Sequence, residues 1–290
     1  MSTPALDLRL RHLLSQQNED GGWGNYPGQA SWLEPTVYGL FALWQPHRKN
    51  AERGLQALRR WQKPGGGFAV SAAVDDVGWG TALALMAHQS AGINDPVYQR
   101  AIGWLTGIEG AEGGPVSWVL KHFIKMQAEQ NEELHGWPWR PGNSSWVEPT
   151  SFALMALKRH GGHARVAEAE AMILDRRCED GGWNYGNRRV YDVALPSFPE
   201  TTAVALLGLQ GRKEAALALP RAQAFWREKP RGIARVWLAL ALQMHGRLDA
   251  APAFEENLPL GGSLSITALE AVALQPGAAK THFGVPGGKG

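Results

Sequence analysis

The chain has 290 residues, of which 44% are hydrophobic, and its formal net charge is +2. This length and hydrophobic content allow one large buried core. The basic residues are scattered and not gathered into a patch that would attract phosphates, which excludes nucleic acid as an expected partner.

One cysteine, Cys178, excludes an internal disulfide framework and fits a reducing compartment. The first residues alternate Leu with charged side chains and lack the apolar run of a signal peptide. No run of about 18 apolar residues predicts a transmembrane helix. We therefore expect a cytoplasmic protein, and peripheral contact with a membrane is left open.

Apolar residues at helical spacing predict paired helices along the chain. The first, outer member of each pair is amphipathic, and the second, inner member is so apolar that it must be covered on most sides. In chain order the predicted pairs are 5–17 with 33–45, 50–62 with 77–89, 96–108 with 147–159, 164–177 with 200–210, 213–227 with 232–245, and 247–257 with 262–274. Six pairs suit a closed two-layer ring with a central cavity, since an open stack would expose an apolar end.

Two segments lie outside the pairs. Residues 110–141 do not fit the repeat of outer and inner helices, and we interpret them as an insertion over the cavity mouth. Residues 276–290 are rich in Gly and Pro, and we expect a flexible tail there. The prediction is one ring domain over residues 1–275.

Three turns after outer helices share a motif. It reads QNEDGGW over residues 17–23, QKPGGGF over 62–68 and RCEDGGW over 177–183. The glycine after each outer helix can adopt the left-handed conformation that ends a helix.

These turns resemble the QW motif of squalene and oxidosqualene cyclases and of protein prenyltransferase β subunits, with Phe68 and Arg177 as single departures. The resemblance covers most of residues 5–275. It implies an all-α fold, an α6/α6 toroid of the terpenoid cyclase and protein prenyltransferase kind. It also implies a structural role, joining neighbouring outer helices, for Gln17, Trp23, Gln62, Phe68 and Trp183.

Acidic residues stand at the starts of three inner helices. Class II cyclases, which the chain resembles, protonate an alkene or epoxide with the middle Asp of an Asp-x-Asp-Asp block at this place. The chain has no complete block; its only nearby Asp pair lies four residues too early and lacks the first Asp. Three glutamates occupy the position of the middle Asp, the third if Thr202 is aligned. The candidate catalytic residues are Glu34, Glu148, Glu200, Asp75 and Asp76.

Two effects compete at these glutamates. A helix N-terminus lowers the pKa of a nearby carboxyl, whereas an apolar cavity raises it. A proton donor requires the second effect to be larger. If the first prevails, the glutamates cap their helices or bond to neighbouring loops.

Aromatic residues near the inner-helix starts are candidates for substrate binding, because aromatic faces attract a carbocation. Simple packing is the alternative for each of them. They are Trp32, Trp79, Trp139, Trp146, Phe198 and Trp237.

We expect no cofactor and no metal. The resemblance to prenyltransferases would imply zinc held by Asp, Cys and His, but Cys178 lies in an outer turn beside Arg177 and Glu179.

Three functions remain open. The first is protonation of an isoprenoid, followed by cyclisation or isomerisation in a Trp-lined cavity. The second is a non-catalytic toroid that holds a lipid, a peptide or a partner protein, and the third is a glycan-active α6/α6 enzyme. The first two predict an apolar small molecule as substrate or ligand. Because class II cyclases usually use two such domains, a second subunit or a homodimer is also left open.

Overall fold

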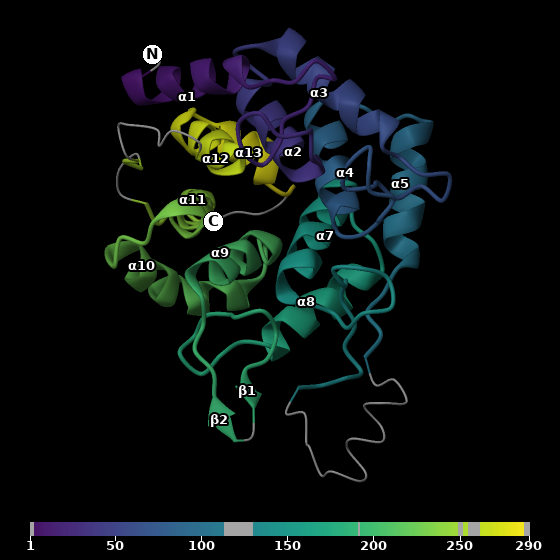
Figure 1. Cartoon of the computed structure of the whole chain (residues 1–290). Helices are drawn as coiled ribbons and strands as arrows, with labels where there is room; N and C mark the ends of the chain where they lie inside the picture. Colours follow the sequence, from purple (N-terminus) through teal and green to yellow (C-terminus); the bar gives the residue numbers. More distant parts are fainter. Residues whose placement is uncertain (1–2, 113–129, 191, 249–251, 255–261, 287–290) are drawn as a thin grey trace. The chain divides into compact units, whose positions relative to one another are not determined.

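The computed structural model describes residues 3–112, 130–190, 192–248, 252–254 and 262–286, and these are almost entirely helical (Figure 1). The chain divides into two compact units. Unit 1 consists of Met1–Leu105 with Leu248–Gly284, and unit 2 consists of Thr106–Arg247 with Val285–Gly290. Within the described parts, no helix is both long and apolar enough to cross a membrane.

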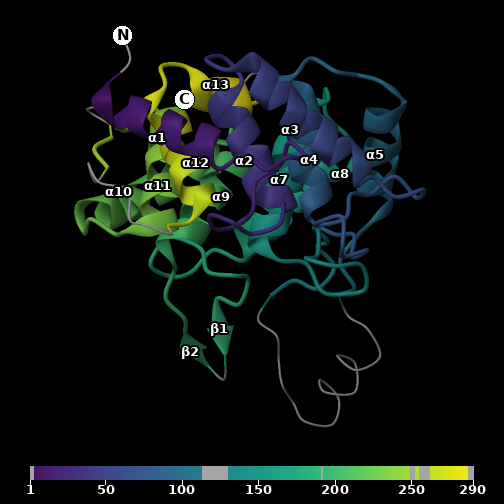
Figure 2. The same cartoon turned by 45° about the horizontal axis from the view of Figure 1, so that its top comes forward.

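Unit 1 is built around a nearly wholly buried helix. Its elements are α1 (Pro4–Ser15), α2 (Leu33–Leu43), α3 (Arg48–Arg60), α4 (Gly80–Ser90), α5 (Pro96–Gly107, which ends at the start of unit 2), α12 (Leu264–Leu274) and α13 (Ala278–Phe283). Every residue of α2 except Glu34 is buried. This helix packs against α3, α4 and α12, while α1 packs against α12. Figures 1 and 2 both show α1, in purple, beside α12, in yellow, so segments far apart in the sequence complete one layer.

Unit 2 repeats the arrangement around another apolar helix. Its elements are α7 (Val147–Arg159), α8 (Arg165–Asp175), α9 (Pro199–Gly208), the 3₁₀ helix η1 (Lys213–Ala218), α10 (Leu219–Arg227) and α11 (Gly232–Met244). Helix α9 packs against α7 and α11. Two short antiparallel strands, β1 (Arg189–Val190) and β2 (Val193–Ala194), form a hairpin that projects from the unit in both views.

The outer–inner helix order predicted from the sequence is confirmed along most of the described chain. The predicted helix 213–227 is a 3₁₀ helix followed by α10, because Pro220 stands at the start of α10 and cannot supply a backbone N–H to a preceding turn. Most of the predicted helix 247–257, and residues 113–129 of the predicted insertion, lie outside the described residues.

The prediction of a flexible tail from residue 276 is wrong for residues 278–283. They form α13, where Phe283 is fully buried. The His282 ring stacks on Phe41 at 4.5 Å between centroids, and Phe283 meets the same ring edge-on at 5.6 Å. The tail is therefore anchored by aromatic burial.

Hydrogen bonds at two Gly-Gly turns confirm for Gln17 and Gln62 the expected role of joining neighbouring outer helices. Gln17 Nε2 donates to the Asn50 carbonyl in α3 at 2.9 Å, and Gln62 Nε2 donates to the Val97 carbonyl in α5 at 2.7 Å. Trp23 Nε1 donates to the Leu13 carbonyl at 2.8 Å. The two Gln bonds thus join each of these turns to the next outer helix, whereas the Trp23 bond ties its turn back to α1.

The glycine two residues before the aromatic is required by its backbone in all three motif turns. Gly21, Gly66 and Gly181 have φ of 94°, 99° and 93°, in the left-handed region. A Cβ at Gly66 would also lie 2.2 Å from the Arg100 carbonyl oxygen. No other residue fits this close approach between turn and outer helix.

Each turn is also tied to the helix that follows it by a threonine. The backbone N–H of the turn aromatic donates to a threonine Oγ1 at 2.9–3.0 Å in four places, namely Trp23 to Thr36, Phe68 to Thr81, Trp137 to Thr150 and Trp183 to Thr202. The third pair shows that Gly136-Trp137 is a fourth turn of the repeat. Trp137 is buried at 2% exposure, so it belongs to the core of unit 2.

Adjacent threonines in α9 provide a test of this link. Thr202 Oγ1 accepts the Trp183 N–H and donates to the Trp183 carbonyl, whereas the buried Thr201 Oγ1 has no partner in the described part of the chain. We expect Thr202→Val to lower the free energy of unfolding by about 1–3 kcal/mol, because it orphans buried backbone groups. Thr201→Val should be neutral or stabilising. Urea unfolding of both variants measures the difference, and equal losses would contradict the assignment.

Candidate functional site

The candidate acids are positioned by the starts of the inner helices. The residues at the N-cap are Trp32, Trp146 and Phe198, all extended, and none forms a side-chain capping bond. Each donates its N–H to the carbonyl of the preceding turn Trp, at 2.8, 3.1 and 2.8 Å. Together with the threonine bond, this fixes the first turn of each helix, and the glutamate follows the N-cap by two residues.

Glu34 is the polar exception on buried α2. It forms no hydrogen bond or ion pair within the described residues, so it does not cap its helix there. Burial removes water from its carboxylate and raises its pKa to about 7. Of the two competing effects expected at this position, desolvation is the larger, and a substantial fraction of Glu34 is protonated at neutral pH.

Unit 2 brings four of the predicted residues together around Tyr185. The Tyr185 ring lies 6.3 Å from the Trp146 ring and 5.2 Å from the Phe198 ring, between centroids. Burial and the nearby carboxylates of Glu200 and Glu148 raise the pKa of its phenol. Two acids and three aromatic rings therefore share one region.

Sequence reasoning did not select Tyr185. The residue follows the turn Trp183 by two positions and keeps 45% of its surface exposed, which is unusual for a large aromatic side chain. The sequence feature that could have identified Tyr185 is the position of an aromatic residue just after a Gly-Gly-Trp turn.

The pKa of Tyr185 is expected to respond to its acidic neighbours. Glu200→Gln should lower it toward the ordinary value, because removing a negative charge makes the phenolate less unfavourable. Titration followed by tyrosinate absorbance, with Tyr185→Phe to assign the signal, measures this shift. The exposed Glu179→Gln is the control, and an equal shift in that variant would contradict the proximity of Glu200.

The acidic pair Asp75 and Asp76 in unit 1 is less buried than a proton donor to carbon should be. The Asp75 side chain is 86% exposed and pairs with Lys63. Asp76 is half-buried, and its backbone carbonyl accepts the Val70 N–H at 3.3 Å. Asp75 is therefore solvated and charge-paired, unlike the buried acid that donation to carbon requires.

The other predicted aromatic residues divide into two groups. Trp237 is 5% exposed, and its ring centroid lies 5.8 Å from that of Phe152. It therefore lies in the core of unit 2, in agreement with the packing alternative. Trp32, Trp79 and Trp139 are half-buried. In the α4 repeat Trp79 stands two residues before the threonine, the position that Glu34 holds in the α2 repeat.

No group of three or more His, Cys, Asp or Glu in the described residues is arranged to hold a metal ion. Cys178 is buried in its turn, and burial raises the pKa of the thiol. A thiol held neutral is a poor metal ligand.

No protein-family model matches the chain. A stretch of 60 residues is 45% identical to drimenyl diphosphate synthase of Streptantibioticus cattleyicolor. The stretch represents 20% of this chain and 11% of that protein, so the shared region is a small part of the relative.

Solved structures resemble the chain over nearly its whole length. A glycosidase is 11% identical over 97% of this chain and 96% of its own, with a TM-score of 0.57. The GH76 α-mannanase of Bacteroides thetaiotaomicron is 13% identical over 94% and 95%, with a TM-score of 0.56. The type II terpene cyclase MstE from Scytonema, in complex with merosterolic acid A, is 16% identical over 94% and 96%, with a TM-score of 0.43. The glycosidase and the mannanase show that the fold class is an all-α toroid. Because they are only 11% and 13% identical to this chain, they show nothing beyond the fold.

Proposed function

We propose that the chain donates a proton to a carbon–carbon double bond of an isoprenoid, which then cyclises or isomerises. The observation that carries this proposal is Glu34, a carboxyl with a pKa of about 7 and no hydrogen bond or ion pair in the described residues. A general acid works best when its pKa lies near the working pH. The stretch shared with drimenyl diphosphate synthase supports the same substrate class.

The proposed reaction needs no cofactor. The Glu34 O–H bond breaks, its proton forms a C–H bond with the less substituted alkene carbon, and a tertiary carbocation results. Further double bonds of the same substrate attack that cation and close rings, or a hydride shifts. Loss of a proton to water then gives a product isomeric with the substrate, and solvent reprotonates Glu34.

Unit 2, considered by itself, also contains groups that can stabilise positive charge. Faces of Trp146, Tyr185 and Phe198 attract a cation through their π electrons. Glu148 and Glu200 add negative charge in the same region of unit 2. Neither glutamate is required as the donor.

Incubation in deuterated water tests the proposal. The purified chain is mixed with farnesyl diphosphate, geranylgeranyl diphosphate, geranylgeraniol or squalene, and the products are analysed by gas chromatography and mass spectrometry after phosphatase treatment. The expected product is an isomer carrying one deuterium, since one solvent deuteron is added and one substrate proton is lost. A product without deuterium, or no product from any of the four, would contradict protonation. Retention of an isoprenoid without conversion would favour the non-catalytic toroid.

A further inference from the structure

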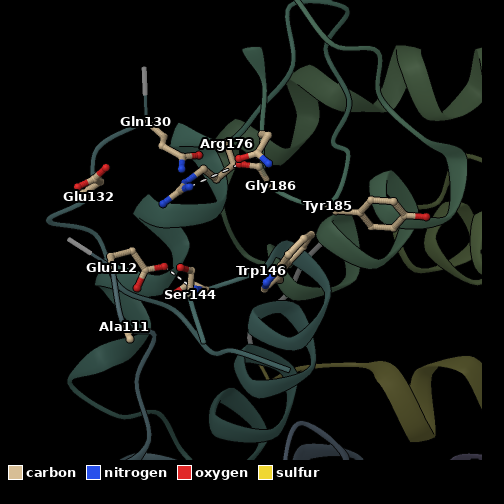
Figure 3. A pocket seen from close by; sticks show the side chains of 11 residues that line it. Ala111, Glu112, Gln130, Glu132, Ser144, Trp146, Arg176, Tyr185 and Gly186 are labelled. Carbon is tan, nitrogen blue, oxygen red and sulfur yellow. Dashed lines mark hydrogen bonds between the residues drawn. The ribbon is translucent and has the colours of Figure 1, made fainter. Parts of the chain in front are cut away.

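Unit 2 contains a polar pocket of about 250 Å³ that the proposed chemistry does not use in full (Figure 3). Its walls come from the loop before α7, the C-cap residue of α8 and the loop after the Trp183 turn. They include Glu112, Gln130, Ser144, Trp146, Arg176 and Tyr185.

Arg176 is buried in this pocket without its full set of partners. Its side chain is 3% exposed. Nη1 donates to the Gly186 carbonyl at a long 3.5 Å. Nε lies 3.5 Å from Asp175 Oδ2 in an ion pair, but neither Nε nor Nη2 forms a hydrogen bond within the described residues. These two nitrogens share one edge of the planar guanidinium, so their N–H donors, neither used in a hydrogen bond, are parallel and suit two neighbouring oxygen atoms.

The charge around Arg176 argues against an anion as the missing partner. Asp175, Glu112 and Glu132 contribute negative charge near it, and Arg188 contributes positive charge. Among the described residues, these two cations and three carboxylates leave one net negative charge. The guanidinium therefore lacks acceptor oxygens and does not lack a counterion, because a further negative charge would be repelled.

Glu112 lacks a hydrogen-bond donor for one of its carboxylate oxygens. Its Oε1 accepts the Ser145 N–H, whereas its buried Oε2 has no partner in the described residues. The pocket thus offers both free N–H donors and a free oxygen acceptor. A hydroxyl group satisfies both, since it accepts and donates.

We propose that this pocket binds a neutral polyhydroxylated ligand, a sugar or a polyol. Two neighbouring hydroxyl oxygens accept from Nε and Nη2 of Arg176, one hydroxyl donates to Oε2 of Glu112, and the C–H face of the ligand lies against Trp146 or Tyr185. Figure 3 shows these side chains lining one space. The proposal does not rest on the isoprenoid chemistry and is measured without turnover.

Binding of free compounds to the full chain tests this site. Saturation-transfer difference NMR and calorimetry are carried out with D-glucose, D-mannose, D-galactose and myo-inositol, and with inorganic phosphate and acetate as anionic probes. At least one polyol should bind saturably, and more tightly than either anion. Arg176→Lys keeps the charge but removes the two-donor edge, and it should weaken binding at least about tenfold. Arg177→Lys, at the neighbouring arginine outside the pocket walls, should leave the affinity unchanged.

A second variant keeps the test decisive if Arg176→Lys does not fold. Ser144 is exposed at the pocket, so Ser144→Phe should fill the space without disturbing buried groups. Polyol binding should then be lost while the thermal midpoint stays within error of wild type. The proposal is overturned by absence of saturable polyol binding, by tighter binding of phosphate or acetate, or by full binding in Ser144→Phe.

Discussion

Replacing Glu34 with glutamine is expected to reduce isoprenoid turnover by at least about 100-fold. General acid catalysis by a positioned side chain contributes roughly 10²–10⁴-fold to rate, and an amide has no proton of comparable acidity. The glutamine side chain has nearly the shape of the glutamate, so the variant removes the proton and keeps the packing of α2. The rate is measured with the substrate that wild type converts in deuterated water.

The pH dependence of the same reaction separates proton donation from binding. Because the pKa of Glu34 is about 7, turnover should be highest below pH 7 and should fall about tenfold per pH unit above it. Glu52→Gln, at an exposed glutamate on α3, should retain both the rate and the profile. If Glu34→Gln kept more than a tenth of the wild-type rate, the donor would have to be another acid, and Glu148→Gln and Glu200→Gln would identify it.

The helices and their turns could be predicted because their signals are local. The spacing of apolar residues and the Gly-Gly turns can each be recognised in a stretch of about ten residues. The turn at Gly136-Trp137 was not recognised in the sequence because His135 precedes Gly136 where the other turns carry a second glycine. The bond from the Trp137 N–H to Thr150 Oγ1 identifies it. Helix α13 was missed for the opposite reason, since Phe283 is buried by Phe41, which is far away in the sequence.

The sequence could place the three glutamates at equivalent positions but could not rank them. All three follow an aromatic N-cap by two residues. Burial raises the pKa of Glu34 to about 7, and the degree of burial depends on residues that are distant in the chain. Arg176 was overlooked for a similar reason. At the end of an amphipathic helix it looks like an ordinary basic residue, and only the structure shows that two of its buried guanidinium nitrogens form no hydrogen bond within the described residues.

The stability of the folded chain should depend on the protonation of Glu34. Its pKa rises from 4.5, the ordinary value that the unfolded chain retains, to about 7 in the folded chain, so the folded state binds the proton more tightly between these values. The stabilisation from the protonated form is fully present below pH 4.5 and is lost as pH rises through 7. A shift of this size corresponds to about 3 kcal/mol.

The test compares two chains at two pH values. Urea unfolding of wild type and Glu34→Gln at pH 5 and pH 8 gives four free energies of unfolding. Burial lowers the pKa values of His88 and His245, which gives stability the opposite pH dependence, but these contributions are the same in both chains and cancel in the difference. Between pH 5 and pH 8, the free energy of unfolding of wild type should fall by about 2–3 kcal/mol more than that of Glu34→Gln.

The exposed Glu52→Gln should follow wild type, since its carboxyl is solvated in both states. Parallel pH dependence in wild type and Glu34→Gln would mean that Glu34 is ionised in the folded chain at neutral pH, and the same result would remove the basis for assigning it as proton donor.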